Sequence, residues 1–304
     1  MCIRDRIIPL IQPDRTPRVS VVMVSYMTGP ALLEATRAVL SDPDIYELIL
    51  VDNGNTPMAR HRLSEIIAEH DKVRVFQGHG NVGFSSGCNY GAKFARGEML
   101  LFLNPDAVIS EGAAMKMAKC GQYLEQPWIV GGMLRDINGK EQKGARRREL
   151  TPINALATFT GLNALSFFKS VHLDHHPLPE SASEMPVISG ACLLTDRESF
   201  ELLDGFDEKY FLHVEDLDIC RRARIAGGEV YFEPSATVLH YGSTSRSPRL
   251  KVEWEKLKGF LVYFWKFSDG WGAKLLLILA APFMTIAIMG RALWLTFRLA
   301  IIGR

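Results

Sequence analysis

The chain has 304 residues, of which 47% are hydrophobic, so it can bury the core of one large α/β domain or of two small ones. Its 35 Lys and Arg residues balance 34 Asp and Glu residues, and this balance gives no indication of a nucleic-acid partner. The five cysteines are odd in number and lie far apart without C-x-x-C spacing, which argues against a disulfide framework and favours a reducing cytosol.

Residues 1–17 are predicted to be a tail outside the fold. No apolar run in this tail is long enough for a signal peptide, because Pro9 interrupts the segment 7–11. The first six residues, MCIRDR, look like translated sequencing adapter and are left out of the predicted fold.

Strand and helix patterns then alternate along the chain. Buried strands are predicted at residues 18–26, 47–51, 73–76 and 99–103, and helices at residues 30–40, 61–70 and 85–96. Such alternation predicts an α/β fold with a mostly parallel sheet and right-handed crossovers. Ligands of these sheets bind beyond the carboxyl ends of the strands, where Asp52 and Asp106 each follow a predicted strand.

Residues 139–184 break this pattern, since they carry consecutive arginines, several histidines and several prolines with little periodicity. A variable excursion over the site is predicted there. After it the sequence predicts a regular segment at 186–194, a helix at 215–225 and strands at 230–232 and 237–241. The helix is expected to end at Gly227 and Gly228 in the manner of a glycine C-cap. The catalytic domain is predicted to span residues 18–249.

Residues 250–304 differ in character, because they are basic and aromatic at first and almost uncharged over residues 275–290. That stretch is shorter than the ~20 residues needed to cross a bilayer. Arg291 and Arg298 are seven residues apart and share one helical face. The pattern favours a helix that lies in the membrane interface. A short transmembrane helix and a buried helix pair remain open as second and third alternatives.

The segment 78–83, GHGNVG, matches the dinucleotide-binding fingerprint G-x-G-x-x-G. It falls in the third strand–helix unit, however, and no acidic residue closes a second strand about 20 residues further on, as ribose binding requires. A Rossmann-type, NAD-dependent oxidoreductase is therefore a weak alternative.

Asn104, Pro105 and Asp106 directly follow a buried strand. One carboxylate at such a strand end can hold a hard divalent cation, Mn²⁺ or Mg²⁺, which stabilises a diphosphate leaving group. Capping of the following turn is the equally good alternative for Asp106. His240, after the last predicted strand, could complete such a site, although a lone histidine is more often structural.

Three acids, Glu215, Asp216 and Asp218, open the helix predicted at 215–225. Carboxylates interact well with a helix N-terminus, but capping explains only one or two of them. A general base that takes a proton from an acceptor hydroxyl has to be held rigidly within hydrogen-bond reach. Asp216 is the first candidate for this base and Glu215 the second, whereas Asp218 is a structural or acceptor contact.

Together these segments resemble glycosyltransferase family 2, and within it the rhamnosyltransferase-like branch, from about Val19 to Ser245. The resemblance rests on the order and spacing of VSVVMVSY, LILVDNG, NVGFSSGCNYG, LLFLNPDA, SGAC, GFDE, HVEDLDICRR and His240 with Ser243.

The resemblance implies a GT-A fold and an inverting single displacement. It assigns Asp106 and His240 to the metal and Asp216, with Glu215, to catalysis. It places the donor among Tyr26, Asp52, Asn81, Gly83, Asn89 and Asn104. Gly190, Asp218, Arg222 and Ser243 fall on the acceptor or phosphate side, with bracing of the helix as the other role for Arg222.

The expected activity is transfer of a sugar from a nucleotide-diphosphate donor, with dTDP-rhamnose favoured, in cell-envelope glycan synthesis. The acceptor is expected to be a lipid-linked saccharide or a polysaccharide at the cytoplasmic face of the cell membrane, because a basic, apolar C-terminus keeps an enzyme at that surface. A non-catalytic sugar-nucleotide- or polysaccharide-binding membrane protein is the alternative. The acids Asp106, Glu215 and Asp216 argue against it, since binding alone needs no base.

Overall fold

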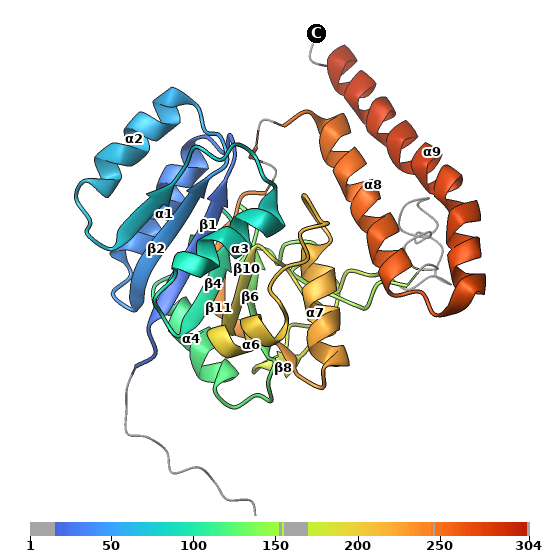
Figure 1. Cartoon of the computed structure of the whole chain (residues 1–304). Coiled ribbons are helices and arrows are strands. Elements are labelled where there is room, and N and C mark those ends of the chain that lie inside the picture. The colour runs from blue at the N-terminus through green and yellow to red at the C-terminus, as the bar shows by residue number, and fades with distance from the viewer. Residues whose placement is uncertain (1–15, 152–153, 155–169, 243, 246, 303–304) are drawn as a thin grey trace, which may run out of the picture.

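The computed structural model describes residues 16–151, 154, 170–242, 244–245 and 247–302. Its centre is a nine-stranded sheet in the order β3-β2-β1-β4-β10-β6-β11-β5, with β8 beside β11 (Figure 1). The strands of this sheet are β1 (Val19–Ser25), β2 (Ile45–Asp52), β3 (Val73–Phe76), β4 (Met99–Leu103), β5 (Ala107–Ile109), β6 (Ile129–Arg135), β8 (Ser183–Glu184), β10 (Cys192–Asp196) and β11 (Val230–His240). Strands β7 (Arg146–Arg147) and β9 (Val187–Ile188) form a separate pair.

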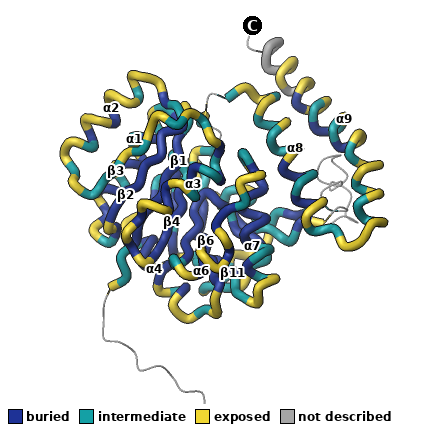
Figure 2. Tube along the Cα trace, in the orientation of Figure 1, coloured by how far each residue is buried: buried dark blue, intermediate teal, exposed yellow. Residues whose placement is uncertain are grey.

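The described helices cover the sheet and extend to one side of it (Figure 1). They are α1 (Pro30–Ser41), α2 (Pro57–Ile67), α3 (Phe84–Phe94), α4 (Ala113–Gly121), α6 (Arg197–Leu202), α7 (Glu215–Ile225), α8 (Arg249–Lys266) and α9 (Gly270–Ile302). The sheet strands form the buried centre of the molecule, whereas much of α9 is exposed along its length (Figure 2).

The N-terminal half is the predicted parallel α/β unit. Strand β1 pairs in parallel with β2 and β4, and its residues are all buried because they are apolar or small on both faces. Helix α3 approaches this sheet closely, since a Cβ on Gly91 would lie 2.6 Å from the Val22 side chain. Ser25 stands opposite Asp52, so β1 and β2 end at one edge, where the site is built.

The C-terminal half extends the sheet with both strand directions. Strand β10 runs antiparallel to β4 and β6, while β6 and β11 are parallel. The prediction of two strands at 230–232 and 237–241 is wrong, because β11 is one strand with a register shift between Glu233 and Thr237. Pro234 explains the shift, since proline has no N–H to donate to the ladder.

The expected glycine C-cap of α7 is confirmed. Gly227 has a φ of 85°, its N–H donates to the Arg224 carbonyl oxygen, and the N–H of Gly228 donates to the Ala223 carbonyl oxygen. These two bonds close a Schellman motif, which satisfies carbonyls that the end of a helix leaves free.

Helices α8 and α9 pack against each other beside the sheet (Figure 1). Helix α8 belongs to the body of the protein, since Leu257, Tyr263 and Phe264 share one core cluster with Phe102 of β4. Residues 250–266 therefore pack onto the predicted catalytic domain.

Helix α9 is a single helix with Pro282 inside it. Its segment Gly270–Arg298 is 29 residues long and contains an 18-residue window with a mean hydropathy of 2.0, so it is long and apolar enough to cross a membrane. Only 11% of this window is buried, so a buried helix pair does not describe α9.

Candidate active site

A cavity of about 610 Å³ opens at the carboxyl edge of β1 and β4, and the first turns of α8 form part of its wall. The loop 211–213, ahead of α7, lines it as well. Five residues predicted for the donor and the metal line it, namely Tyr26, Asn81, Gly83, Asn104 and Asp106. The cavity therefore lies at the edge of the sheet where the sequence predicts the ligand site.

Asp106 and His240 meet at the wall of this cavity. The Nε2 atom of His240 lies 3.1 Å from Oδ1 of Asp106 and 3.3 Å from Nδ2 of Asn104. Thr244 donates a 3.0 Å hydrogen bond to the other carboxylate oxygen of Asp106. Burial opposes ionisation of Asp106, but the hydrogen bonds from His240 and Thr244 outweigh it, so the pKa of Asp106 lies below its ordinary value.

The tautomer of His240 follows from Gln142. The amide nitrogen of Gln142 donates to the backbone carbonyl of His240, so its amide oxygen faces Nδ1 of the ring. Nδ1 therefore carries a proton, so Nε2 donates to the Asp106 carboxylate only when both ring nitrogens are protonated, and otherwise turns a lone pair towards it. A lone pair and an anion that face each other at this distance call for a cation between them, either a proton or a metal ion.

The Asp106–His240 pair fits a divalent cation. Two ligands at right angles, each ~2.1 Å from an octahedral ion, lie ~3.0 Å apart, close to the 3.1 Å between Nε2 and Oδ1. In the described part of the chain no three His, Cys, Asp or Glu side chains converge on one such position. A cation would therefore depend on two protein ligands and keep sites open for phosphate oxygens.

Asn53, which the sequence analysis did not single out, shapes the donor side of the cavity. Its Nδ2 donates to the Gly83 carbonyl oxygen at 2.9 Å, and Oδ1 of Asn81 accepts the Gly83 N–H at 3.1 Å. Gly83 has a φ of 89°, and a Cβ there would lie 2.7 Å from the Phe211 carbonyl oxygen. The glycines of the segment 78–83 thus serve a tight turn at the start of α3.

Two residues predicted for the donor lie away from the cavity wall. Asp52 is buried, and its carboxylate accepts from the N–H groups of Gly54 and Asn55 and from Arg60 Nε at 2.7 Å. It therefore holds the turn after β2. Asn89 is bound at both ends of its amide to the backbone of Phe206, at 2.8 and 2.9 Å, and it lines a different cavity.

The acids of α7 lie behind the cavity loop. Asp216 accepts hydrogen bonds from the N–H of Gly190 at 3.0 Å and from the guanidinium of Arg147. The Oε2 atom of Glu215 is buried and has no hydrogen-bond partner among the described residues. His213 (φ 68°) and Val214 (φ 75°) have left-handed backbone conformations and directly precede the first turn of α7. This conformation costs ~1–3 kcal/mol per residue and clusters at functional sites.

The two adjacent carboxyls have opposite pKa shifts. Burial, aided by the charge of Asp216, raises the pKa of Glu215 to about 8. Burial also acts to raise the pKa of Asp216, but the charge and hydrogen bond of Arg147 and the N–H of Gly190 outweigh it and lower that pKa. At neutral pH only Asp216 is ionised, so it is the member of the pair that can accept a proton.

Replacing Glu215 with Gln is expected to stabilise the protein at alkaline pH. The folded pKa of Glu215, about 8, lies above its ordinary 4.5, so the unfolded chain loses this proton first as the pH rises. The stability that the protonated carboxyl contributes is full below pH 4.5 and is lost as the pH rises towards 8. The gap in melting temperature between the variant and the wild type should widen across this window. An exposed control, Glu69→Gln, should leave the gap at zero, and a flat profile for Glu215→Gln would contradict the raised pKa.

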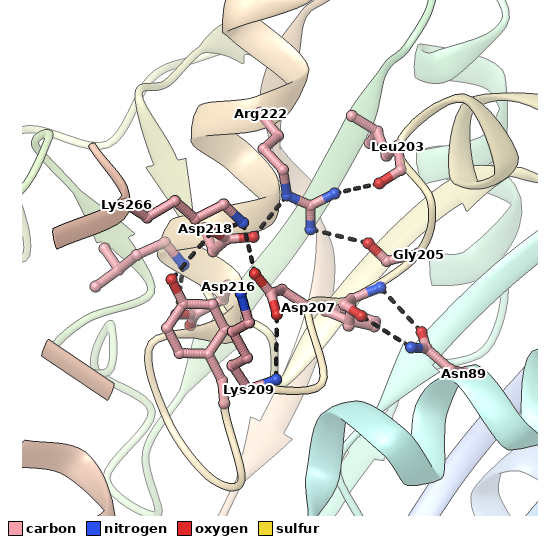
Figure 3. Close-up of polar contacts among 12 residues, drawn as sticks. Asn89, Leu203, Gly205, Asp207, Lys209, Asp216, Asp218, Arg222 and Lys266 are labelled. Carbon is pink, nitrogen blue, oxygen red and sulfur yellow. Dashed lines mark hydrogen bonds and ion pairs between the residues drawn. The ribbon is translucent and has the colours of Figure 1, made fainter. Parts of the chain in front are cut away.

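Asp218 and Arg222 form a structural network on the side of α7 (Figure 3). The fully buried carboxylate of Asp218 accepts from Arg222 Nε at 2.6 Å and from Lys266 Nζ of α8 at 2.7 Å. The guanidinium of Arg222 also donates to the carbonyl oxygens of Leu203 and Gly205. Of the two roles left open for Arg222, the geometry fits bracing, and Asp218 fits the structural role. Ser243 lies outside the described residues.

The fold is that of a nucleotide-sugar transferase of the GT-A class. It is similar to the mannosyltransferase PcManGT from Pyrobaculum calidifontis, solved with GDP-Man and Mn²⁺, with a TM-score of 0.57 at 15% identity. The match covers 93% of this chain and 75% of that one.

The chain belongs to glycosyl transferase family 2, whose model matches residues 20–203. It is 26% identical over 277 residues to the N-acetylglucosaminyl-diphospho-decaprenol L-rhamnosyltransferase of Mycobacterium tuberculosis, covering 84% of this chain and 87% of that protein. It is 22% identical to the rhamnosyltransferase WbbL of Escherichia coli, with 73% and 83% covered. The resemblance predicted from the motifs is confirmed, and the protein is a glycosyltransferase that uses a nucleotide sugar.

Proposed function

We propose that the protein is an inverting, metal-dependent rhamnosyltransferase that acts on a saccharide carried by a lipid diphosphate. The observation that carries the metal dependence is the Asp106–His240 pair on the cavity wall. The sugar and the acceptor are inferred from the relative in Mycobacterium tuberculosis, whose name specifies rhamnose and a diphospho-decaprenol acceptor. The site residues of the sequence analysis enter this proposal as assignments to be tested.

The proposed reaction is a single displacement. The acceptor hydroxyl oxygen bonds to the anomeric carbon while the bond from that carbon to the diphosphate oxygen breaks, and Asp216 takes the hydroxyl proton. Attack from the face opposite the diphosphate inverts the anomeric configuration. A divalent cation, when bound, supplies positive charge that stabilises the leaving diphosphate. Asp106 and His240 would hold it, and Asn104 orients His240.

Thermal stabilisation by donors tests this proposal. The purified protein is mixed with UDP-, GDP- and dTDP-sugars in the presence of Mn²⁺, Mg²⁺ or EDTA, since a ligand that binds only the folded state raises its melting temperature. We expect the largest rise with dTDP-rhamnose and a divalent cation. A rise with another nucleotide class would replace the sugar assignment, and no rise with any donor would contradict the proposed function.

Helix α9 is proposed to lie in the plane of a membrane surface. Met284, Ile288 and Ala292 lie at helical spacing on one buried face, and Thr296 reaches the cavity. Because residues 284–292 pack onto the body of the protein, this part of the helix is held beside the domain, which favours an orientation along the bilayer surface. The opposite face exposes large apolar side chains, namely Leu276, Leu279, Phe283, Ile286, Leu293 and Phe297. An apolar face of this kind inserts between headgroups, which would bring the cavity to a lipid-linked acceptor.

Replacing Leu279 and Phe283 with Glu should remove the protein from membranes. These side chains are 60% and 72% exposed, and each apolar side chain of this size contributes ~1.5–3 kcal/mol when it leaves water. Vesicle binding, measured by flotation, should therefore fall by ~10² or more. Leu202→Glu, at a site 63% exposed in α6, is the matched control and should float like the wild type. Undiminished flotation of the double variant would remove α9 as the membrane contact.

A further inference from the structure

Lys256 of α8 lies beside the site and has no partner among the described residues. It follows Val252, which lines the cavity, by four residues, and precedes Gly259, which packs against the loop 213–214, by three. Residues at these spacings share one face of a helix, so Lys256 lies between the cavity wall and the start of α7. Among the described residues its ammonium forms no hydrogen bond and no ion pair, unlike Lys266 at the other end of α8.

Arg147 supplies a second cation on the same side of the site. One of its terminal nitrogens donates to Asp216 and to the Ile188 carbonyl oxygen, but its buried Nε has no partner among the described residues. The charges of Lys256 and Arg147 both lower the pKa of His213, which burial already brings to about 4. The two cations therefore converge on the loop that lines the cavity.

The charges around Lys256 leave positive charge in excess. Among the described residues, the charges that affect the pKa of its ammonium most are the carboxylates of Glu253 and Asp216 and the cations Arg291, from α9, and Arg147. Glu215 adds no charge at neutral pH because its pKa is raised to about 8. Three cations thus share two carboxylates, and Asp216 is already bound to Arg147. A site with spare cationic donors in a half-buried location binds anions, and phosphate most strongly.

We infer that Lys256 and Arg147 bind the diphosphate group of the lipid-linked acceptor beside the base. A diphosphate that engages Arg147 draws the guanidinium away from Asp216, so the carboxylate is uncovered only when the acceptor is in place. The inference rests on the proposed function and assigns the acceptor subsite of that same site. Lys256, from α8, holds the phosphate from the membrane side of the cavity, where α9 brings the lipid.

Farnesyl diphosphate tests the subsite without knowledge of the acceptor sugar. Its Kd is measured by titration calorimetry with the full-length protein in EDTA, so that the probe is not held through a metal at Asp106 and His240. We expect Lys256→Met to raise the Kd about tenfold or more, as for the loss of a charge-assisted hydrogen bond. Lys256→Arg should restore most of the affinity. Lys258→Met, on an exposed side chain two residues away that pairs with Glu255, should bind like the wild type.

Farnesol, which lacks the diphosphate, should bind Lys256→Met and wild-type protein equally. Equal affinity of Lys256→Met and wild type for farnesyl diphosphate, or no binding by the wild type, overturns the inference. Thermal stabilisation by nucleotide sugar and Mn²⁺ is recorded on the same samples and reports folding of each variant. If that stabilisation is present while farnesyl diphosphate does not bind, only the acceptor subsite fails; if the wild type shows no donor stabilisation, the proposed function fails.

Discussion

Replacing Asp216 with Asn should lower kcat by ~10² or more while the Kd of the donor stays nearly unchanged. The side chain keeps its size, and its amide oxygen can still accept the N–H of Gly190. What it loses is the ability to take a proton from the acceptor hydroxyl. Single-turnover kinetics with saturating donor would measure the chemical step, and donor-induced thermal stabilisation would measure binding.

Glu215→Gln is the matched control for this prediction. Glu215 is adjacent in sequence and similarly buried, but its raised pKa keeps it protonated at neutral pH, so Gln closely replaces the form that is present. We expect kcat at pH 7 to change far less than in Asp216→Asn. The assignment of the base would be reversed if Glu215→Gln lost the activity and Asp216→Asn kept it.

The sequence was sufficient for the parts of the fold that local patterns specify. Strands β1 and β4 are continuous buried runs, and their period and length predict strands covered on both faces. Asp106 could be placed at the sheet edge because it follows β4 directly. Helix α7 begins and ends as predicted, since acids open it and Gly227 closes it.

The remaining features depend on contacts between distant parts of the chain. Arg147 donates a hydrogen bond to Asp216, which lies 69 positions further along the sequence. Arg147 belongs to a two-residue strand in a segment without periodicity. Asn89 looked like a donor residue because it lies in the motif beside Asn81, yet its amide is bound to a backbone 117 positions away. Helix α8 was assigned to the membrane by composition, but Phe260, Tyr263 and Phe264 lie in the core of the domain. Residue type alone does not distinguish these outcomes.

Replacing Asp106 with Ala should abolish the metal-dependent part of donor binding. The carboxylate of Asp106 and the imidazole of His240 are the pair placed to hold a cation. The pKa of Asp106 is lowered, so its carboxylate is ionised at neutral pH. Without it, His240 is the sole remaining member of the pair, and one imidazole holds a hard cation weakly. We expect kcat/KM to fall by ~10³ because the leaving diphosphate loses several kcal/mol of charge stabilisation.

The decisive comparison is between Mn²⁺ and EDTA. Wild-type protein should be stabilised more by donor with Mn²⁺ than with EDTA, whereas Asp106→Ala should show the smaller, EDTA-like rise under both conditions. The donor contacts expected of Tyr26 do not depend on Asp106, so this residual rise should equal that of the wild type in EDTA. Asp71→Ala removes an exposed carboxylate that is not among the residues lining the cavity. It controls for the loss of a negative charge. If Asp106→Ala retained a full Mn²⁺ response, Asp106 would be left with the turn-capping role that its sequence position equally allows.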